Sequence, residues 1–136
     1  MVRQSLLWLS RQNSLFTFLK SNPLARRFAS RFVAGETIEQ GVAAAAELAP
    51  RGITASLDLL GESVTKAEEA IAAKDEYLAM LDRMAAAPGV EVNVSVKLTQ
   101  MGFDLDEDLC HRNMTQILDK ARTLGGFVRL DMESSA

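Results

Sequence analysis

The sequence predicts an α/β fold in which N-terminal helices precede a strand–helix–strand–helix–strand unit. Residues 53–60, 92–98 and 127–133 alternate apolar and polar side chains, as strands with two different faces do. The intervening segments 65–86 and 104–124 begin with capping or acidic residues and end at glycine, as helices do. Helices of this length between strands favour right-handed crossovers, and therefore a parallel sheet.

Composition narrows the classes of protein to which the chain can belong. It has 136 residues, 48% hydrophobic and 24% charged, which is typical of one soluble domain with a real core. Cys110 is the single cysteine, so an intrachain disulfide is impossible and a cytoplasmic redox setting is expected. With one cysteine and one histidine, His111, no metal site is predicted. No apolar run approaches the roughly 20 residues that span a bilayer.

The first part of the chain is basic. Residues 1–35 carry six basic residues and no acidic one, whereas residues 36–136 have a net charge of −9. This pattern fits a helix with a solvated basic face, a membrane-surface helix or a transit peptide. We expect no nucleic-acid binding by this segment. We divide the chain into a basic helical segment, 1–36, and a second domain, 37–136.

Capping patterns define the helices before the first strand and after it. Asn22-Pro23 interrupts the leader, and residues 26–32 could form a short second helix. Thr37–Gln40 resembles a capping box and predicts an alanine-rich helix to Ala49. Thr65–Glu68 is a second match and predicts the start of the long helix.

The polar side chains of all three predicted strands become more charged toward the C-terminal end. They are Thr54, Ser56 and Asp58, then Asn93, Ser95 and Lys97, then Arg129, Asp131 and Glu133. In a (β/α) barrel this face points inward, and the active site lies at the C-terminal mouth. We therefore expect Asp58, Lys97 and Asp131 to line one sector of such a mouth. Pairing of Lys97 with an aspartate would keep both groups ionised. An internal ion-pair network without chemistry is the alternative.

Other catalytic signatures are absent from the sequence. It contains no Walker loop, no G-x-G-x-x-G and no G-x-S-x-G, and no Cys–His or Ser–His pair falls on the strands. Cys110 fits the apolar stripe of the third predicted helix, and His111 is expected at the surface. The methionines at helical spacing are expected in the core; they are Met80, Met84 and Met114.

Four motifs carry a resemblance to a known family. They are Phe32–Glu36 (FVAGE), Leu57–Glu62 (LDLLGE), Ser95–Gly102 (SVKLTQMG) and Phe127–Glu133 (FVRLDME). Each is weak alone, but together, in this order on the strand–helix pattern, the chain resembles the bacterial monofunctional proline dehydrogenases. The resemblance covers nearly the whole chain, including the basic leader, which favours an intrinsic helical segment over a removable signal.

The resemblance implies a distorted (β/α)8, TIM-like barrel that holds FAD. Such enzymes oxidise L-proline to Δ1-pyrroline-5-carboxylate and pass a hydride from the carbon beside the nitrogen to the flavin. By motif, Lys97 would bind the substrate carboxylate and Asp131 would be the active-site acidic residue. Met132 would contact FAD, although alternation places it on the helix-facing side of its strand. Expected partners are L-proline and a quinone or other electron acceptor. The setting would be cytoplasmic, with peripheral membrane contact through the basic segment possible.

The length departs from the family pattern. A barrel of this type needs roughly 250 residues, but the sequence ends at Ala136, just after the third strand. The family's later flavin contacts and substrate-gripping arginines would lie beyond that point. We therefore expect the N-terminal part of such an enzyme, from a truncated gene or an incomplete sequence. The alternatives are an inactive half-barrel that acts by association and an enzyme of another barrel family.

Overall fold

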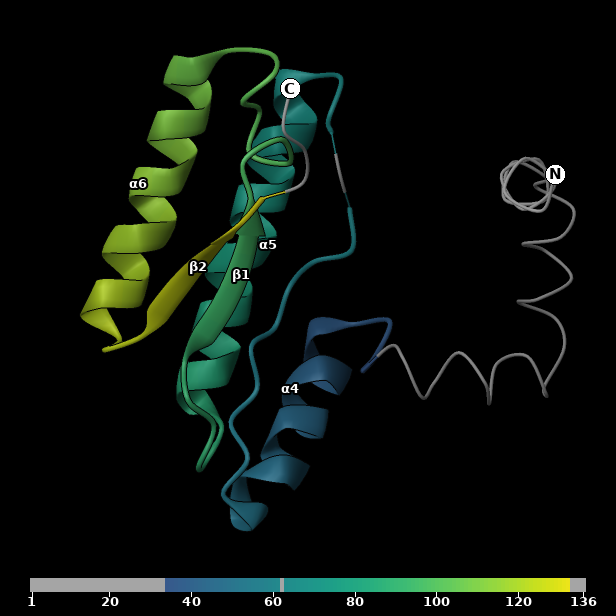
Figure 1. The fold of residues 1–136 in the computed structure, drawn as a ribbon, viewed down its shortest axis with the longest axis vertical. Helices are drawn as coiled ribbons and strands as arrows, with labels where there is room; N and C mark the ends of the chain where they lie inside the picture. The colour runs from purple at the N-terminus through teal and green to yellow at the C-terminus, as the bar shows by residue number, and fades with distance from the viewer. Residues whose placement is uncertain (1–33, 62, 133–136) are drawn as a thin grey trace, which may run out of the picture. The chain divides into compact units, whose positions relative to one another are not determined.

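The computed structural model describes residues 34–61 and 63–132, whose ribbon is shown in Figure 1. The described residues from Thr37 to Met132 belong to one compact unit. Its elements are α4 (Ile38–Leu48), the short 3-10 helix η1 (Ala49–Arg51), α5 (Ala67–Ala86), β1 (Asn93–Lys97), α6 (Glu107–Thr123) and β2 (Phe127–Asp131). The predicted leader helices fall in residues 1–33, outside the described part of the chain.

Two helix starts show how closely capping patterns locate an N-terminus. The Thr37 Oγ1 accepts a hydrogen bond from the Gln40 N–H at 3.3 Å, which confirms the predicted start of α4. Helix α5 begins one residue later than predicted, with Lys66 as its N-cap. Glu69 therefore accepts the N–H groups of Thr65 at 2.9 Å and Lys66 at 3.2 Å. The prediction that Glu68 would do so is wrong, because the carboxylate of the third helical residue is the one that reaches back.

Strands β1 and β2 form the expected parallel pair, with α6 as the crossover between them. Their register runs from Asn93 opposite Phe127 to Lys97 opposite Asp131. Helices α5 and α6 pack against each other, and α4 packs against α5. In Figure 1, β1 lies in front of α5, and α6 lies beside β2.

The first predicted strand, residues 53–60, is reduced to a single parallel bridge between Leu57 and Val94. The Leu57 N–H donates to the Asn93 carbonyl at 3.0 Å, and the Ser95 N–H donates to the Leu57 carbonyl at 2.9 Å. The predicted direction is therefore right and the predicted length is wrong. The ladder stops because the next inward amide, that of Leu59, donates to the Tyr77 hydroxyl at 3.3 Å instead.

The core lies between β1 and the helices. Val94 and Val96 of β1 are fully buried, as the alternation predicts. The helix residues that pack around them are Tyr77, Met80, Leu81, Met84, Cys110, Met114, Ile117 and Ala121. The core positions predicted for the methionines and for Cys110 are confirmed, and His111 is exposed as expected. Burial raises the pKa of the Cys110 thiol.

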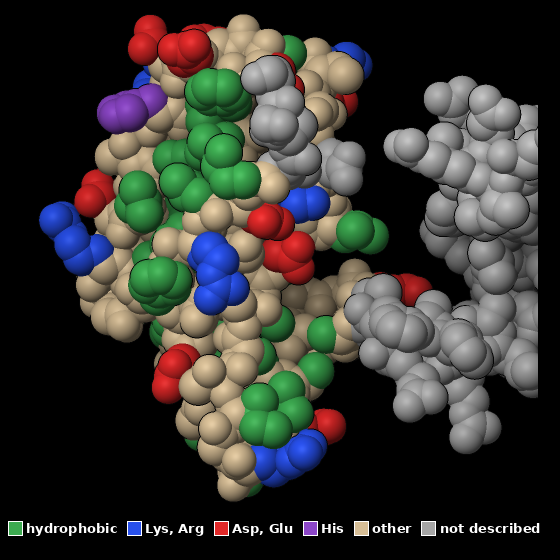
Figure 2. Space-filling view, in the orientation of Figure 1, with side chains coloured by type: hydrophobic (Ala, Val, Ile, Leu, Met, Phe, Trp, Pro, Cys, Tyr) green, Lys and Arg blue, Asp and Glu red, His purple; other side chains and the backbone are tan. Residues whose placement is uncertain are grey.

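The apolar side of β2 is less covered than predicted. Val128 packs against the core, but the exposed fractions of Leu130 and Met132 are 50% and 79%. The prediction that all three would pack beneath helices is wrong, because among the described residues β2 pairs only with β1 and no element covers its C-terminal half. Figure 2 shows hydrophobic side chains gathered on the face formed by α6 and β2.

The turn between α6 and β2 provides a test of packing. A Cβ on Gly126 would lie 2.5 Å from the Val92 Cγ1 and 2.8 Å from the Val92 carbonyl oxygen, and the backbone atom cannot rotate away. Gly126→Ala is therefore expected to lower the free energy of unfolding by about 1–3 kcal/mol, measured by chemical denaturation. In Gly41→Ala, the matched control in α4, the new Cβ has only Leu57 at 3.9 Å, so better helix propensity should preserve or raise stability. Equal stability of the two variants would contradict this packing.

Candidate active site

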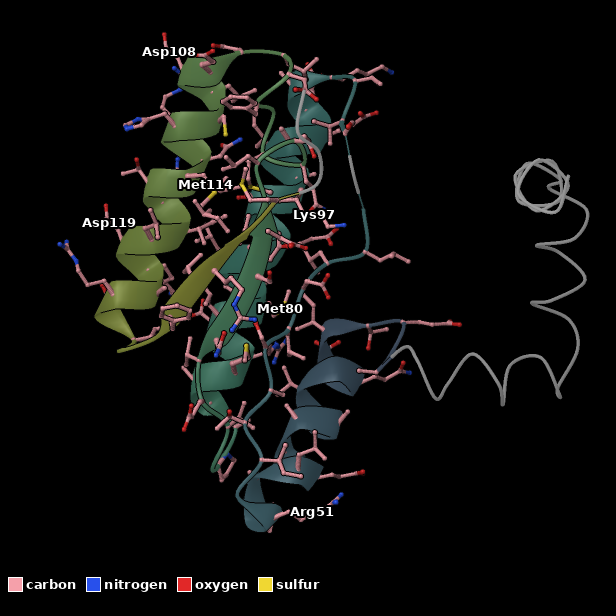
Figure 3. The ribbon with its side chains drawn as sticks, viewed as in Figure 1. Arg51, Met80, Lys97, Asp108, Met114 and Asp119 are labelled. Carbon is pink, nitrogen blue, oxygen red and sulfur yellow. The ribbon has the colours of Figure 1, made fainter. Side chains whose placement is uncertain are left out.

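Lys97 and Asp131 are direct register partners at the C-terminal ends of β1 and β2. Side chains of partners in a parallel pair point to the same face of the sheet. Because Val94 and Val96 fill the opposite face toward the helices, Lys97 and Asp131 share the face directed away from the core. Lys97 is half-buried and Asp131 is exposed. Figure 3 shows Lys97 at the upper end of β1.

Asp58 approaches the same region from the other side of β1. It follows Leu57, which bridges to Val94 and packs against the core, so alternation directs Asp58 away from the helices. The negative charges of Asp58 and Asp131 act together on one buried group, the Tyr77 hydroxyl. The structure thus places Asp58, Lys97 and Asp131 on three neighbouring chain segments at one end of the sheet.

Tyr77 is the residue of this region that the sequence analysis missed. It lies on α5 and is fully buried, and its hydroxyl donates a hydrogen bond to the Ser95 carbonyl at 2.8 Å. The same oxygen accepts the Leu59 N–H at 3.3 Å. A tyrosine on the buried face of a helix was the available signal, but it does not reveal which backbone groups the hydroxyl joins.

The turn after β1 fixes the end of the strand that carries Lys97. Met101 is fully buried, and its carbonyl accepts a hydrogen bond from the Asn113 Nδ2 at 3.1 Å. Gly102 has φ of +95°, and a Cβ there would lie 3.2 Å from Leu109. The motif that follows Lys97 therefore builds a tightly packed turn, which restricts movement of the strand end.

Met132 directly follows Asp131 and is highly exposed. Its side chain is accessible, as contact with a cofactor requires, although alternation directs it to the opposite face from Asp131. Arg129 is also exposed and lies opposite Ser95 in the register. Glu133, the last residue of the predicted polar face, lies outside the described residues.

Two hollows of the described surface lie at the other end of the strands from Lys97 and Asp131. Two open hollows of about 410 and 510 Å³ share Gly125, Gly126 and Phe127 in their walls. Neither is lined by Lys97 or Asp131. Among the described residues, no group of three or more His, Cys, Asp and Glu side chains could hold a metal ion.

Tyr77 titration offers a direct check of this geometry. Burial first, and then the charges of Asp58 and Asp131, raise the pKa of Tyr77 to about 12 from an ordinary value of 10.0. The free energy of unfolding is therefore expected to be independent of this group below about pH 10 and to fall as the pH rises toward 12, because the unfolded chain loses the phenol proton first. Tyr77 is the only tyrosine, so ultraviolet absorbance of the phenolate reports it alone. Urea-unfolded chain is the control, and equal pKa values in the two states would contradict the buried site.

Comparison with known proteins gives the family. Residues 42–136 match the family described as proline dehydrogenase. The chain is 40% identical to the proline dehydrogenase of Deinococcus radiodurans over 108 residues, which are 77% of this chain and 34% of that protein. It is 35% identical to proline dehydrogenase 1 of Bacillus subtilis strain 168 over 133 residues, or 98% of this chain and 43% of that protein.

A solved structure agrees in fold. The crystal structure of proline utilization A from Bdellovibrio bacteriovorus, inactivated by N-propargylglycine, matches with a TM-score of 0.69 and 21% identity. The match covers 81% of this chain and 14% of that one. The chain thus has the α/β fold of part of a TIM-like barrel, and it spans less than half the length of these relatives. On the family match over residues 42–136, the chain belongs to the proline dehydrogenase family.

Proposed function

We propose that this chain supplies the N-terminal part of a (β/α)8 barrel that oxidises L-proline to Δ1-pyrroline-5-carboxylate, the first step of proline degradation. The observation that carries the proposal is the pairing in register of Lys97 and Asp131 at the C-terminal ends of β1 and β2. Active sites of such barrels lie at that end of the strands. An ammonium and a carboxylate side by side there suit an amino acid substrate, which carries one group of each charge.

Lys97 and Asp131 have different roles in binding proline. Lys97 binds the substrate carboxylate through a charge-assisted hydrogen bond, which is stronger than one between neutral groups. Asp131 accepts hydrogen bonds from polar groups around the proline and so orders them. Half-burial of Lys97 strengthens its attraction for the carboxylate, because surrounding protein atoms screen charges less than water does.

FAD is the cofactor we propose. Met132 follows Asp131 at the end of the described strand and is highly exposed, so its side chain is accessible to a flavin ring. Met132 would contact FAD from the strand end, and Asp131 would remain available to the substrate. Bound flavin supplies the hydride acceptor for the carbon beside the proline nitrogen.

The setting of the enzyme is also a proposal. We propose a cytoplasmic protein that passes electrons to a quinone or another acceptor, with residues 1–36 as a basic helical segment that contacts a membrane surface. In the described part of the chain, no helix combines the length and hydropathy needed to cross a membrane. The charge of residues 1–35 supports surface contact, because basic segments are attracted to anionic lipids.

A half-barrel that acts by association is the second candidate. The exposed side chains on α6 and β2 favour it, because an apolar patch beside an open strand edge promotes pairing with another chain. The members of this patch are Leu118, Phe127, Leu130 and Met132.

A chimaeric enzyme tests the proposed activity. In it, this chain replaces the matching 43% of Bacillus subtilis proline dehydrogenase 1. Purified chimaera is expected to bind flavin and to lose the oxidised flavin absorbance when proline is added without an electron acceptor. A chimaera that folds and binds flavin, but leaves it oxidised with excess proline, would contradict the proposed function.

Lys97→Met in this chimaera tests the substrate contact. Loss of a charge-assisted contact worth about 1.5–3 kcal/mol should raise the KM for proline about 10- to 100-fold in steady-state assays. Flavin content should stay the same. Lys120→Met is the matched control, because the Lys120 Nζ pairs with Asp82 at 2.6 Å, away from the candidate site. An unchanged KM in Lys97→Met would remove Lys97 from the substrate site.

A further inference from the structure

We propose that Tyr77 is a positioning residue of the active site, whose hydroxyl replaces one ladder hydrogen bond and so sets Asp58 relative to Lys97. The geometry is a property of this chain. Its relevance to catalysis rests on the proposed function.

The ladder beside β1 shows the replacement. In a parallel pair, the evenly spaced pattern that begins with Leu57 N–H to Asn93 and Ser95 N–H to Leu57 continues with Leu59 N–H to the Ser95 carbonyl. The Tyr77 hydroxyl occupies that third place. It accepts the Leu59 N–H at 3.3 Å and donates its proton to the Ser95 carbonyl at 2.8 Å.

The Tyr77 hydroxyl oxygen separates β1 from the chain that follows Leu57, at the position of Asp58. Leu57 is bonded directly to β1, whereas Leu59 is linked to it only through the hydroxyl of Tyr77. Asp58 lies at this divergence, and Lys97 lies two residues after Ser95 on β1. The distance between the two charged side chains therefore depends on the hydroxyl of Tyr77.

The space that the separation opens is filled by a second side chain. Gln100 is buried, and its Oε1 lies 3.5 Å from the Tyr77 hydroxyl. A Cβ on Gly61 would lie 2.6 Å from the Gln100 Nε2, so the chain passes directly against this amide. Gln100 thus keeps the segment after Leu59 from closing onto β1.

The helix behind the sheet holds the hydroxyl in place. Tyr77, Leu81 and Met84 of α5 are all fully buried in the core, so the ring cannot swing out. The hydroxyl is protonated at neutral pH, and burial together with the charges of Asp58 and Asp131 extends this state into the alkaline range by raising its pKa. A protonated hydroxyl can donate to one carbonyl and accept from one amide, which is the pattern needed here.

Tyr77→Phe tests the ladder in the 136-residue chain. The remaining ring blocks direct pairing, so the Leu59 amide loses its acceptor and should exchange with deuterium at least about 10-fold faster. The amides of Leu57 and Ser95, whose partners do not involve Tyr77, should change less than about twofold. Met84→Ala is the control on the same helix, in which all three amides should speed up together. A uniform increase in Tyr77→Phe, or no change at Leu59, would overturn the inference.

Steady-state kinetics of the chimaeric enzyme test whether Tyr77 positions Asp58 for catalysis. In Tyr77→Phe, misplacement of Asp58 should lower kcat/KM for proline about 10- to 100-fold at unchanged flavin content. Met84→Ala, assayed below its unfolding temperature, should keep kcat/KM within about twofold of the parent. Retention of kcat/KM by Tyr77→Phe in an active chimaera overturns the inference. An unreactive parent chimaera refutes the proposed function instead, and the exchange comparison still decides whether Tyr77 sets the ladder.

Discussion

Asp131→Ala in the chimaeric enzyme is expected to reduce the rate of flavin reduction by proline about 10- to 1000-fold, as loss of one positioned polar group at a reacting centre does. Asp131 is the register partner of Lys97, and its charge acts on the buried Tyr77 hydroxyl. Its removal therefore disturbs the polar groups that order the substrate while the strands and their packing stay intact. Stopped-flow absorbance of the flavin after mixing with proline measures the rate directly.

Two control variants separate this effect from a general loss of charge. Asp119→Ala removes an exposed carboxylate on α6 that pairs with Arg122 at 3.3 Å, so it should leave the rate within about twofold. Asp131→Asn keeps the shape but not the charge of the side chain, and it should fall between Asp131→Ala and the parent. Flavin reduction at nearly the parent rate in Asp131→Ala would show that Asp131 is only a structural ion-pair member.

The sequence was sufficient to predict that Lys97 and Asp131 lie on neighbouring strand ends, although it did not reveal Tyr77. Alternation in Val92–Leu98 and Phe127–Glu133, with a helix of crossover length between them, implies two adjacent parallel strands. Parallel neighbours bring their C-terminal ends together, so Lys97 and Asp131 had to lie close. This inference uses only local periodicity and chain order, both of which can be read directly from residues.

Other features depend on contacts that periodicity does not contain. The strand predicted at 53–60 fails after Leu57 because a hydroxyl from α5, 18 residues further along the chain from Leu59, enters the ladder. Alternation assigned Met132 to a face but could not say whether any element covers that face. The start of α5 differs by one residue, because Lys66, which the Ser/Thr pattern does not include, is the N-cap and Glu69 is the third helical residue.

The 136-residue chain expressed alone is expected to show no proline turnover and no stoichiometric FAD binding. Among the described residues β2 pairs with β1 alone, so one edge of the sheet offers unpaired backbone groups. Asp58, Arg129 and Asp131 are exposed, and water around their charges opposes the preorganisation that catalysis requires. Leu130 and Met132 would stay exposed as well, which favours association with a second copy.

The measurement is the flavin spectrum of purified chain after FAD is added and excess ligand is removed, before and after proline. Size-exclusion chromatography in parallel should show self-association, and Leu130→Lys on the exposed patch should reduce it because a charge there disfavours burial. The parent chimaera, treated in the same way, is the positive control for flavin binding. Stoichiometric flavin that bleaches with proline would contradict the prediction. If such activity disappeared with self-association in Leu130→Lys, the site would be one that two copies complete together.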